Sequence, residues 1–147
     1  MAKITILYYS KGGRTKALAE IIKNTLDPLL PSGYESELVP ATTLNFERLK
    51  DSAAFIFGTP DYFSHVAGYL KIFFDDLWEQ REMFKGRPAM GFVTHGGGGK
   101  ATGALESLCS SFKLDYVKPT ISTNKPVDEK LKAQIKTNCE KLVKLLK

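Results

Sequence analysis

The stretch Lys3-Ile-Thr-Ile-Leu-Tyr-Tyr9, followed by Ser10-Lys11-Gly12-Gly13-Arg14-Thr15, decides the fold. Its first part is almost wholly apolar, β-branched or aromatic, which is typical of a strand buried on both faces. From Arg14 to Leu26 the apolar residues recur at helical spacing. The chain therefore begins with a buried strand, a glycine turn and a helix.

The same alternation of strand and helix continues toward the C-terminus. Strands are expected over residues 34–39, 53–58, 87–94 and 116–122, and helices over residues 42–50, 66–80, 105–112 and 128–146. The second strand is more polar, as at a sheet edge, and Pro119 interrupts the last one. Alternation with apolar strands predicts an α/β fold, in which helices cover both faces of a parallel sheet. Ligands of such sheets bind beyond the carboxyl ends of the strands.

Composition indicates a globular protein that folds as one domain over residues 1–147. The chain is 43% hydrophobic and 25% charged, and no apolar run approaches the length of a membrane span. No export signal follows Met1, so we expect a cytoplasmic protein. The net charge is +5, but the lysines are scattered and no nucleic-acid motif is present, so we expect no nucleic-acid partner.

The cysteines do not suggest a metal site. Cys109 and Cys139 lie on predicted helices, without a Cys-x-x-Cys or Cys/His cluster. We expect both to pack as small apolar side chains. No metal is expected.

The glycine turn at residues 10–15 has the chemistry of a phosphate cradle. Glycines let several backbone N–H groups converge, and the helix dipole adds partial positive charge. Ser10 and Thr15 supply hydroxyl groups, while Lys11 and Arg14 supply charge. The spacing is neither that of a Walker A loop nor that of a dinucleotide fingerprint. The alternative is an ordinary glycine turn before a helix.

A second loop, Gly58-Thr-Pro-Asp-Tyr-Phe-Ser-His65, follows the third strand. Tyr62 and Phe63 are large aromatic residues whose faces can stack on a flat ring. The alternative is that both plug the base of the sheet.

A third loop, Thr94-His-Gly-Gly-Gly-Gly-Lys100, follows the fourth strand. Glycine lets a backbone approach a flat ligand closely; the alternative is a flexible surface loop. His65 and His95 lie on the expected crevice rim and are candidate proton donors or anion partners, because imidazole titrates near neutral pH. Surface or capping roles are the alternative for both.

These loops carry resemblances to known families. Residues 10–15 resemble the flavodoxin phosphate loop Thr/Ser-x-Thr-x-x-Thr, with Ser10, Gly12 and Thr15 on its hydroxyl-rich positions. Gly12 departs from the hydroxyl residue often found there. Residues 58–75 resemble the NAD(P)H:quinone oxidoreductases related to the tryptophan-repressor-binding protein. The matching residues are Gly58, Thr59, Pro60, Phe63, Gly68, Leu70, Lys71, Phe73 and Asp75. Ser64 replaces the usual glycine and Tyr62 the usual arginine.

The resemblance implies a flavodoxin-like three-layer sandwich with a five-stranded parallel sheet of order 2-1-3-4-5, and FMN as cofactor. It implies that Phe63 lies beside the flavin ring. The third loop lacks the aromatic residue that flanks the flavin in electron-carrier flavodoxins, so we expect one flavin face to be open. The expected cofactor-binding residues are Ser10, Lys11, Gly12, Gly13, Arg14, Thr15, Thr59, Pro60, Asp61, Tyr62, Phe63, Thr94, His95, Gly96, Gly97 and Gly98.

Three functions are compatible with this reading. The first is an FMN-dependent oxidoreductase that takes hydride from NAD(P)H and reduces a quinone or similar acceptor; the basic charge and the Gly-Thr-Pro motif favour it. The second is a one-electron carrier between partner proteins, and the third a non-catalytic binding module. The quinone oxidoreductases it resembles are longer, with segments that build a tetramer, so we expect a monomer or homodimer.

Overall fold

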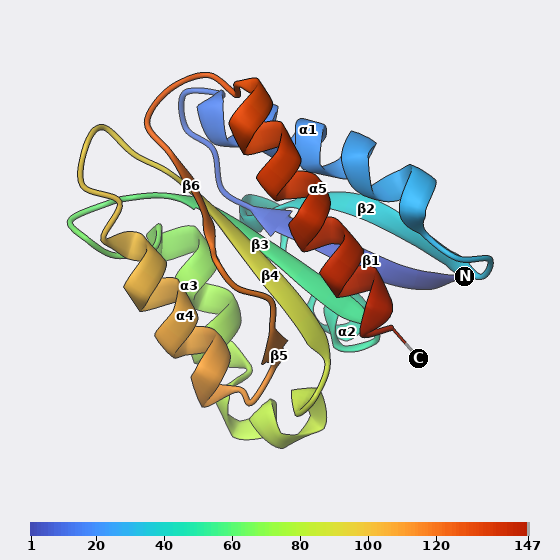
Figure 1. The fold of residues 1–147 in the computed structure, drawn as a ribbon. Helices are drawn as coiled ribbons and strands as arrows, with labels where there is room; N and C mark the ends of the chain where they lie inside the picture. The colour runs from blue at the N-terminus through green and yellow to red at the C-terminus, as the bar shows by residue number, and fades with distance from the viewer. Residues whose placement is uncertain (147) are drawn as a thin grey trace.

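A parallel sheet forms the centre of the computed structural model, which describes residues 1–146 (Figure 1). The strand order is β2-β1-β3-β4-β5, and β6 also pairs with β4. The strands are β1 (Ala2–Tyr8), β2 (Tyr34–Pro40), β3 (Ala54–Pro60), β4 (Pro88–Thr94), β5 (Asp115–Tyr116) and β6 (Ile121–Thr123). Every pairing among them is parallel. The predicted doubly wound order is therefore confirmed, with the polar β2 at an edge.

Helices cover both faces of the sheet, as predicted. They are α1 (Arg14–Leu26), α2 (Phe46–Lys50), α3 (Gly68–Asp76), α4 (Ala101–Ser111) and α5 (Glu129–Lys144). One face packs against α1 and α5, and the other against α3 and α4 (Figure 1). Within residues 1–146, no helix has the length and apolarity that crossing a membrane requires.

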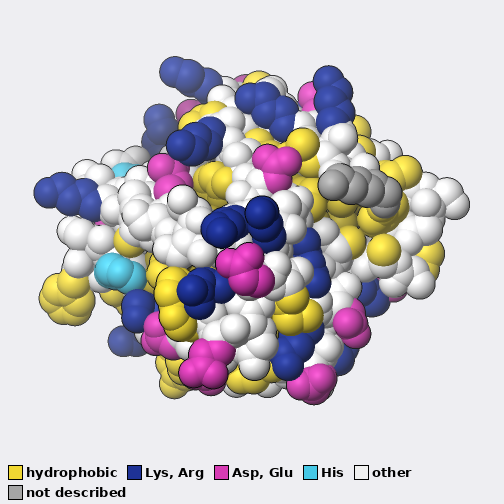
Figure 2. Space-filling view, turned by 90° about the horizontal axis from the view of Figure 1, so that it is seen from below, with side chains coloured by type: hydrophobic (Ala, Val, Ile, Leu, Met, Phe, Trp, Pro, Cys, Tyr) yellow, Lys and Arg dark blue, Asp and Glu magenta, His cyan; other side chains and the backbone are white. Residues whose placement is uncertain are grey.

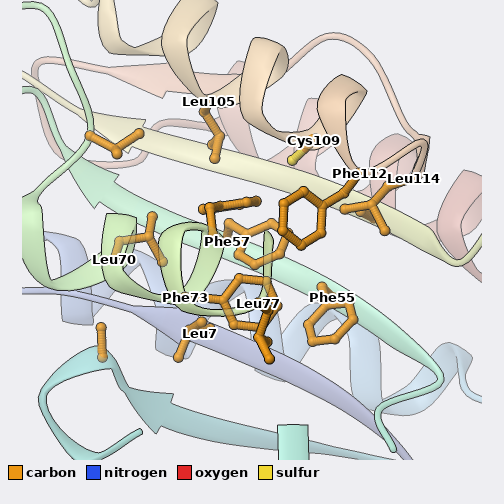
Figure 3. Close-up of a cluster of buried hydrophobic side chains, with 14 of the residues drawn as sticks. Leu7, Phe55, Phe57, Leu70, Phe73, Leu77, Leu105, Cys109, Phe112 and Leu114 are labelled. Atoms are coloured by element: carbon orange, nitrogen blue, oxygen red, sulfur yellow. The ribbon is translucent and has the colours of Figure 1, made fainter. Parts of the chain in front are cut away.

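Strand β3 shows why its sequence is apolar throughout. Phe55 and Phe57 point to one face, where each ring centroid lies 5.4 Å from that of Phe73 on α3 (Figure 3). Ile56, between them, belongs to the core under α1 and α5. Successive side chains of a strand alternate between the faces, so a strand covered on both sides needs apolar residues at every position.

The cysteines are part of these cores. Cys109 and Cys139 are free and buried, as expected, one in each core. Burial raises the pKa of both thiols, that of Cys139 to about 12. Both therefore remain neutral thiols at physiological pH.

Charges are mixed over the surface rather than gathered by sign. On the face shown in Figure 2, lysine and arginine side chains alternate with acidic ones. Exposed pairs such as Lys23–Asp27 (3.0 Å) and Lys71–Asp75 (2.9 Å) each contribute at most about 1 kcal/mol. The stability of the fold therefore comes mainly from the two cores.

Besides α4, which begins at Ala101 rather than at residue 105, three elements differ from the sequence prediction. The expected helix 42–50 is a 3-10 turn at Ala41–Thr43 followed by α2, which starts late because the Asn45 side chain accepts the N–H of Arg48. The expected helix 66–80 begins at Gly68, because the N–H of Ala67 donates to Thr59 instead. It ends at Asp76, and a 3-10 helix over Trp78–Phe84 follows.

The third difference is the last strand, which is split into β5 and β6. Proline has no N–H to donate to a neighbouring strand. The Lys118–Pro119 bond is cis, and the carbonyl of Pro119 accepts a hydrogen bond from Asn138 on α5 at 2.7 Å. The chain therefore leaves the sheet at Pro119 and returns at Ile121.

Replacement of Phe73 by alanine should lower the free energy of unfolding by about 3–5 kcal/mol, because it opens a cavity among the phenylalanine rings. Phe63→Ala is the matched control, since Phe63 is fully exposed whereas Phe73 is 1% exposed. We expect the control to change stability by no more than about 0.5 kcal/mol. Urea unfolding followed by circular dichroism measures both; equal losses would contradict this placement of the core.

Candidate functional site

Three loops meet at the carboxyl ends of the central strands, as the sequence predicts. The hydroxyl of Thr15 lies 2.7 Å from that of Thr94, at the end of β4. The carbonyl of Thr94 accepts the N–H of Asp61 at 2.9 Å. Thr94 therefore ties the first loop (residues 10–15) and the second (residues 58–65) to the third (residues 94–100). We call the region between these three loops the crevice.

The first loop leaves the N-terminus of α1 open. Gly13, the N-cap residue, has φ +96°, a conformation that side chains rarely adopt. The Ser10 hydroxyl accepts the N–H of Gly13 at 3.1 Å, which leaves its own proton available. Within residues 1–146, no N-cap side chain makes a capping hydrogen bond at α1, α3 or α4, whereas Asn45 caps α2 and Asp128 caps α5. At the start of α4, the N–H of Ala101 donates to Asp61 instead. The first N–H groups of α1 therefore point to a place where an anion would act as the cap.

A depression of about 260 Å³ lies against this helix end. Its lining residues are Tyr8, Tyr9, Ser10, Lys11, Gly13, Lys16, Pro40, Ala41 and Thr42. Within residues 1–146, Lys11, Arg14 and Lys16 form no ion pair; Arg14 donates only to the carbonyl of His95, at 3.4 Å. Unpaired cations beside a helix N-terminus favour an anionic ligand.

Lys16 and the segment 40–42 were not predicted as site residues. Lys16 lies three positions after Gly13, in the first turn of α1, which was a usable signal. Nothing local in Pro40-Ala-Thr42 indicates a site, because the pairing of β2 with β1 brings it there.

The second loop is a tight hairpin turn. Tyr62 and His65 exchange backbone hydrogen bonds of 2.9 and 3.0 Å around Phe63 and Ser64. Both central residues have positive φ, 56° and 65°, which is uncommon for residues other than glycine. Phe63 is 104% exposed and Tyr62 is 36% exposed. Neither plugs the base of the sheet, so that alternative is wrong; the turn holds an aromatic ring in solvent beside the crevice.

Two polar side chains of this loop are used to fix its backbone. Thr59 is fully buried; its hydroxyl accepts the N–H of Ala67 and donates to the carbonyl of Pro60. The carboxylate of Asp61 accepts the N–H of Ser64 at 2.8 Å and that of Ala101, the first residue of α4, at 3.2 Å. Thr59 and Asp61 are therefore available to a ligand mainly through their backbone.

Three tyrosine rings, which the sequence did not indicate as a group, lie together beside the second loop; we call Tyr9, Tyr62 and Tyr69 the aromatic ladder. The ring of Tyr9 stacks on that of Tyr69 with centroids 4.9 Å apart. The ring of Tyr62 contacts that of Tyr9 edge-on, with ring centroids 6.4 Å apart. Tyr9 ends a predicted strand and Tyr69 lies on a predicted helix, so only the tertiary fold brings them together. The ladder gives the crevice an apolar wall next to the depression.

The histidines occupy different surroundings. His65 is exposed, and its Nδ1 accepts the N–H of Val66 at 2.9 Å, so the neutral ring carries its proton on Nε2. Among residues 1–146, His95 Nδ1 is the buried side-chain polar atom that lacks a hydrogen-bond partner. A methyl group on Gly99 would come within 3.0 Å of His95 Nε2 and 3.1 Å of the Ser122 hydroxyl. The imidazole of His95 therefore lies close to Gly99, and the Ser122 hydroxyl is near the same glycine.

Gly96, Gly97 and Gly98 form the open side of the third loop. A side chain added at any of them would meet no atom within 4 Å. Their backbone is thus uncovered next to the second loop, as a close approach to a flat ligand requires.

Comparison with known proteins agrees with this geometry. The family model described as NADPH-dependent FMN reductase matches residues 2–125. A flavodoxin from the domain Archaea superposes with a TM-score of 0.82 at 18% identity, covering 97% of this chain and 96% of its own. For flavodoxin 1 from Bacillus cereus the TM-score is 0.82 at 15% identity, with coverages of 99% and 100%.

Rubredoxin oxygen:oxidoreductase from Desulfovibrio gigas gives a TM-score of 0.83 at 17% identity, over 97% of this chain. This chain spans only 35% of that longer protein. At these identities the structures establish the flavodoxin-like fold. The family match extends over most of the 147 residues, and the chain belongs to the NADPH-dependent FMN reductase family.

Proposed function

We propose that this chain, as one domain, is an oxidoreductase that binds FMN in the crevice, takes electrons from NADPH and passes them to a quinone or similar acceptor. FMN is the cofactor that the family and the fold imply. The observation that carries the proposal is the uncapped N-terminus of α1, set among Lys11, Arg14 and Lys16.

The first loop fits a phosphate group. Within residues 1–146, the N–H groups at the start of α1 have no side-chain cap, and the Ser10 hydroxyl accepts rather than donates in its hydrogen bond with Gly13. Gly12 has open space where a side chain would lie, so a ligand oxygen can approach its backbone. Thr15 differs from the expectation, because its hydroxyl is buried against Thr94. We therefore assign most of the phosphate binding to backbone N–H groups and the neighbouring cations.

The other loops fit a flat ring. The backbone of residues 96–98 is uncovered, and the backbone of residues 59–63 is fixed by Thr59 and Asp61. Phe63 adds an exposed aromatic ring at the rim. The proposed FMN-binding residues remain Ser10, Lys11, Gly12, Gly13, Arg14, Thr15, Thr59, Pro60, Asp61, Tyr62, Phe63, Thr94, His95, Gly96, Gly97 and Gly98.

Bound FMN supplies the ability to accept a hydride and to release electrons to an acceptor. The protein contributes binding and electrostatics. Lys11, Arg14 and Lys16 would hold positive charge beside the phosphate of the cofactor. His65 presents Nε2–H at the exposed end of the second loop and is the side chain we propose as proton donor to an acceptor.

A quinone as acceptor is supported by the Gly58-Thr-Pro motif and by the absence of an aromatic residue in the third loop. The exposed ring of Phe63 would offer a second flat molecule a stacking surface. We further propose that the protein is cytoplasmic and acts as a monomer or homodimer.

Gly12→Asp should weaken FMN binding at least about tenfold, because a carboxylate would enter the phosphate site. The fold should tolerate it, since no atom lies within 4 Å of the added Cβ. Gly12→Ser, which restores a hydroxyl, is the control and should bind at least as tightly as the wild type. Flavin fluorescence titration measures the affinities. Riboflavin, which lacks the phosphate, should bind all three proteins alike; an equal loss for riboflavin would refute the phosphate assignment.

Anaerobic stopped-flow mixing tests the proposed activity. NADPH should bleach the FMN absorbance of the loaded protein in a single rapid phase, and added quinone should restore it. Failure of both NADPH and NADH to bleach the flavin, with accumulation of a one-electron-reduced protein during chemical titration, would instead identify an electron carrier.

A further inference from the structure

A second cavity lies on the other side of His95 from the crevice. Its volume is about 410 Å³, and we call it the β6–α5 cavity. Its lining residues are His95, Ser122, Thr123, Asn124, Lys125, Asp128, Lys130, Leu131 and Gln134. They come from the end of β6, the segment that follows it and the first turns of α5 (Figure 1). Its lining residues other than Leu131 carry polar or charged side chains, and the proposed function above does not use the cavity.

The charges of the cavity favour an anion. Lys130 forms no ion pair within residues 1–146, and Lys125 has only a long contact with Asp128, at 3.5 Å. Asp128 is the one acidic residue in the lining, and its other oxygen accepts the N–H of Leu131 at 2.8 Å as the cap of α5. With two lysines and one engaged carboxylate, the cavity carries net positive charge.

Neutral donors complement these cations. The hydroxyl of Ser122 and the amide of Asn124 make no hydrogen bond to residues 1–146 that would occupy them. Gln134 is held in place by donating to Asn138 at 2.7 Å. Ammonium, hydroxyl and amide groups together are hydrogen-bond donors that suit the oxygens of a phosphate ester. Among residues 1–146, the lining contains no Phe, Tyr or Trp, and the imidazole of His95 is its one aromatic ring.

The cavity is joined to the crevice through His95. The N–H of His95 donates to the carbonyl of Thr123 at 3.1 Å, which fixes the third loop to β6. His95 and Ser122 both line the cavity, and the carbonyl of His95 accepts a hydrogen bond from Arg14 of the first loop. A ligand that spans both places would therefore pass over His95.

We propose that the β6–α5 cavity binds the 2′-phosphate of NADPH and thereby makes the chain prefer NADPH to NADH. The inference rests on the proposed function, in which NADPH is the electron donor. A phosphate monoester carries close to two negative charges at neutral pH, whereas NADH has a neutral hydroxyl at that position. Lys125 and Lys130 supply the matching charge, and the phosphate of FMN occupies a separate place at α1.

Binding of adenosine 2′,5′-bisphosphate to the FMN-loaded protein tests the cavity directly, by calorimetry. The wild type should bind it at least about tenfold more tightly than 5′-AMP, and the double variant Lys125→Gln/Lys130→Gln should lose that difference. The variant Lys132→Gln/Lys136→Gln removes the same charge from α5 outside the cavity and should keep the difference. Equal binding of both nucleotides by the wild type, or an unchanged difference in the first variant, would overturn the inference.

Flavin reduction separates this inference from the function on which it rests. In Lys125→Gln/Lys130→Gln, half-maximal reduction should require at least about tenfold more NADPH, with the NADH requirement nearly unchanged. If NADPH reduces the wild type and the preference is the same in the variant, the inference alone fails. If NADPH does not reduce the wild type, the proposed function fails as well.

Discussion

The side chain and backbone of Thr94 hold the three crevice loops together. Its hydroxyl meets the buried hydroxyl of Thr15, and its carbonyl accepts the N–H of Asp61. Loss of either hydroxyl would leave the other buried without its partner, at a cost of about 1–3 kcal/mol. Because Thr15 belongs to the first turn of α1, the same contact fixes where that helix points. The open N–H groups of α1 and the backbone of the second loop therefore keep a fixed relative position.

The sequence predicts the parts of the fold that depend on local pattern. The apolar run before Gly13 and the helical spacing after it indicate β1 and α1, and strand–helix alternation indicates a parallel sheet with helices on both faces. The strand order itself was implied by the resemblance to flavodoxins. Helix ends are less predictable, because they depend on tertiary partners. The N–H of Ala67, for example, donates to the hydroxyl of Thr59, eight residues earlier, and α3 begins only after Ala67. The split between β5 and β6 was signalled by Pro119, but its extent was not.

The candidate site also has features that the sequence predicts and features that it does not. Composition and glycine placement point to the three loops, yet the uses of individual side chains come from distant contacts. Thr15 bonds to Thr94, which lies 79 residues away, and Asp61 caps a helix that starts 40 residues later. Phe63 and Ser64 have positive φ although neither is glycine, so the residue types do not predict this turn. The β6–α5 cavity likewise depends on tertiary contacts, because it brings His95 beside residues 122–134.

The central claim is that the phosphate of FMN replaces the missing cap of α1. Backbone amide signals in a ¹⁵N–¹H NMR titration test it most directly. With FMN, the account predicts large shifts at residues 12–16, and with riboflavin it predicts shifts at residues 59–63 and 96–98 but little change at residues 12–16. Equal shifts at residues 12–16 with both ligands, or none there with FMN, would contradict it.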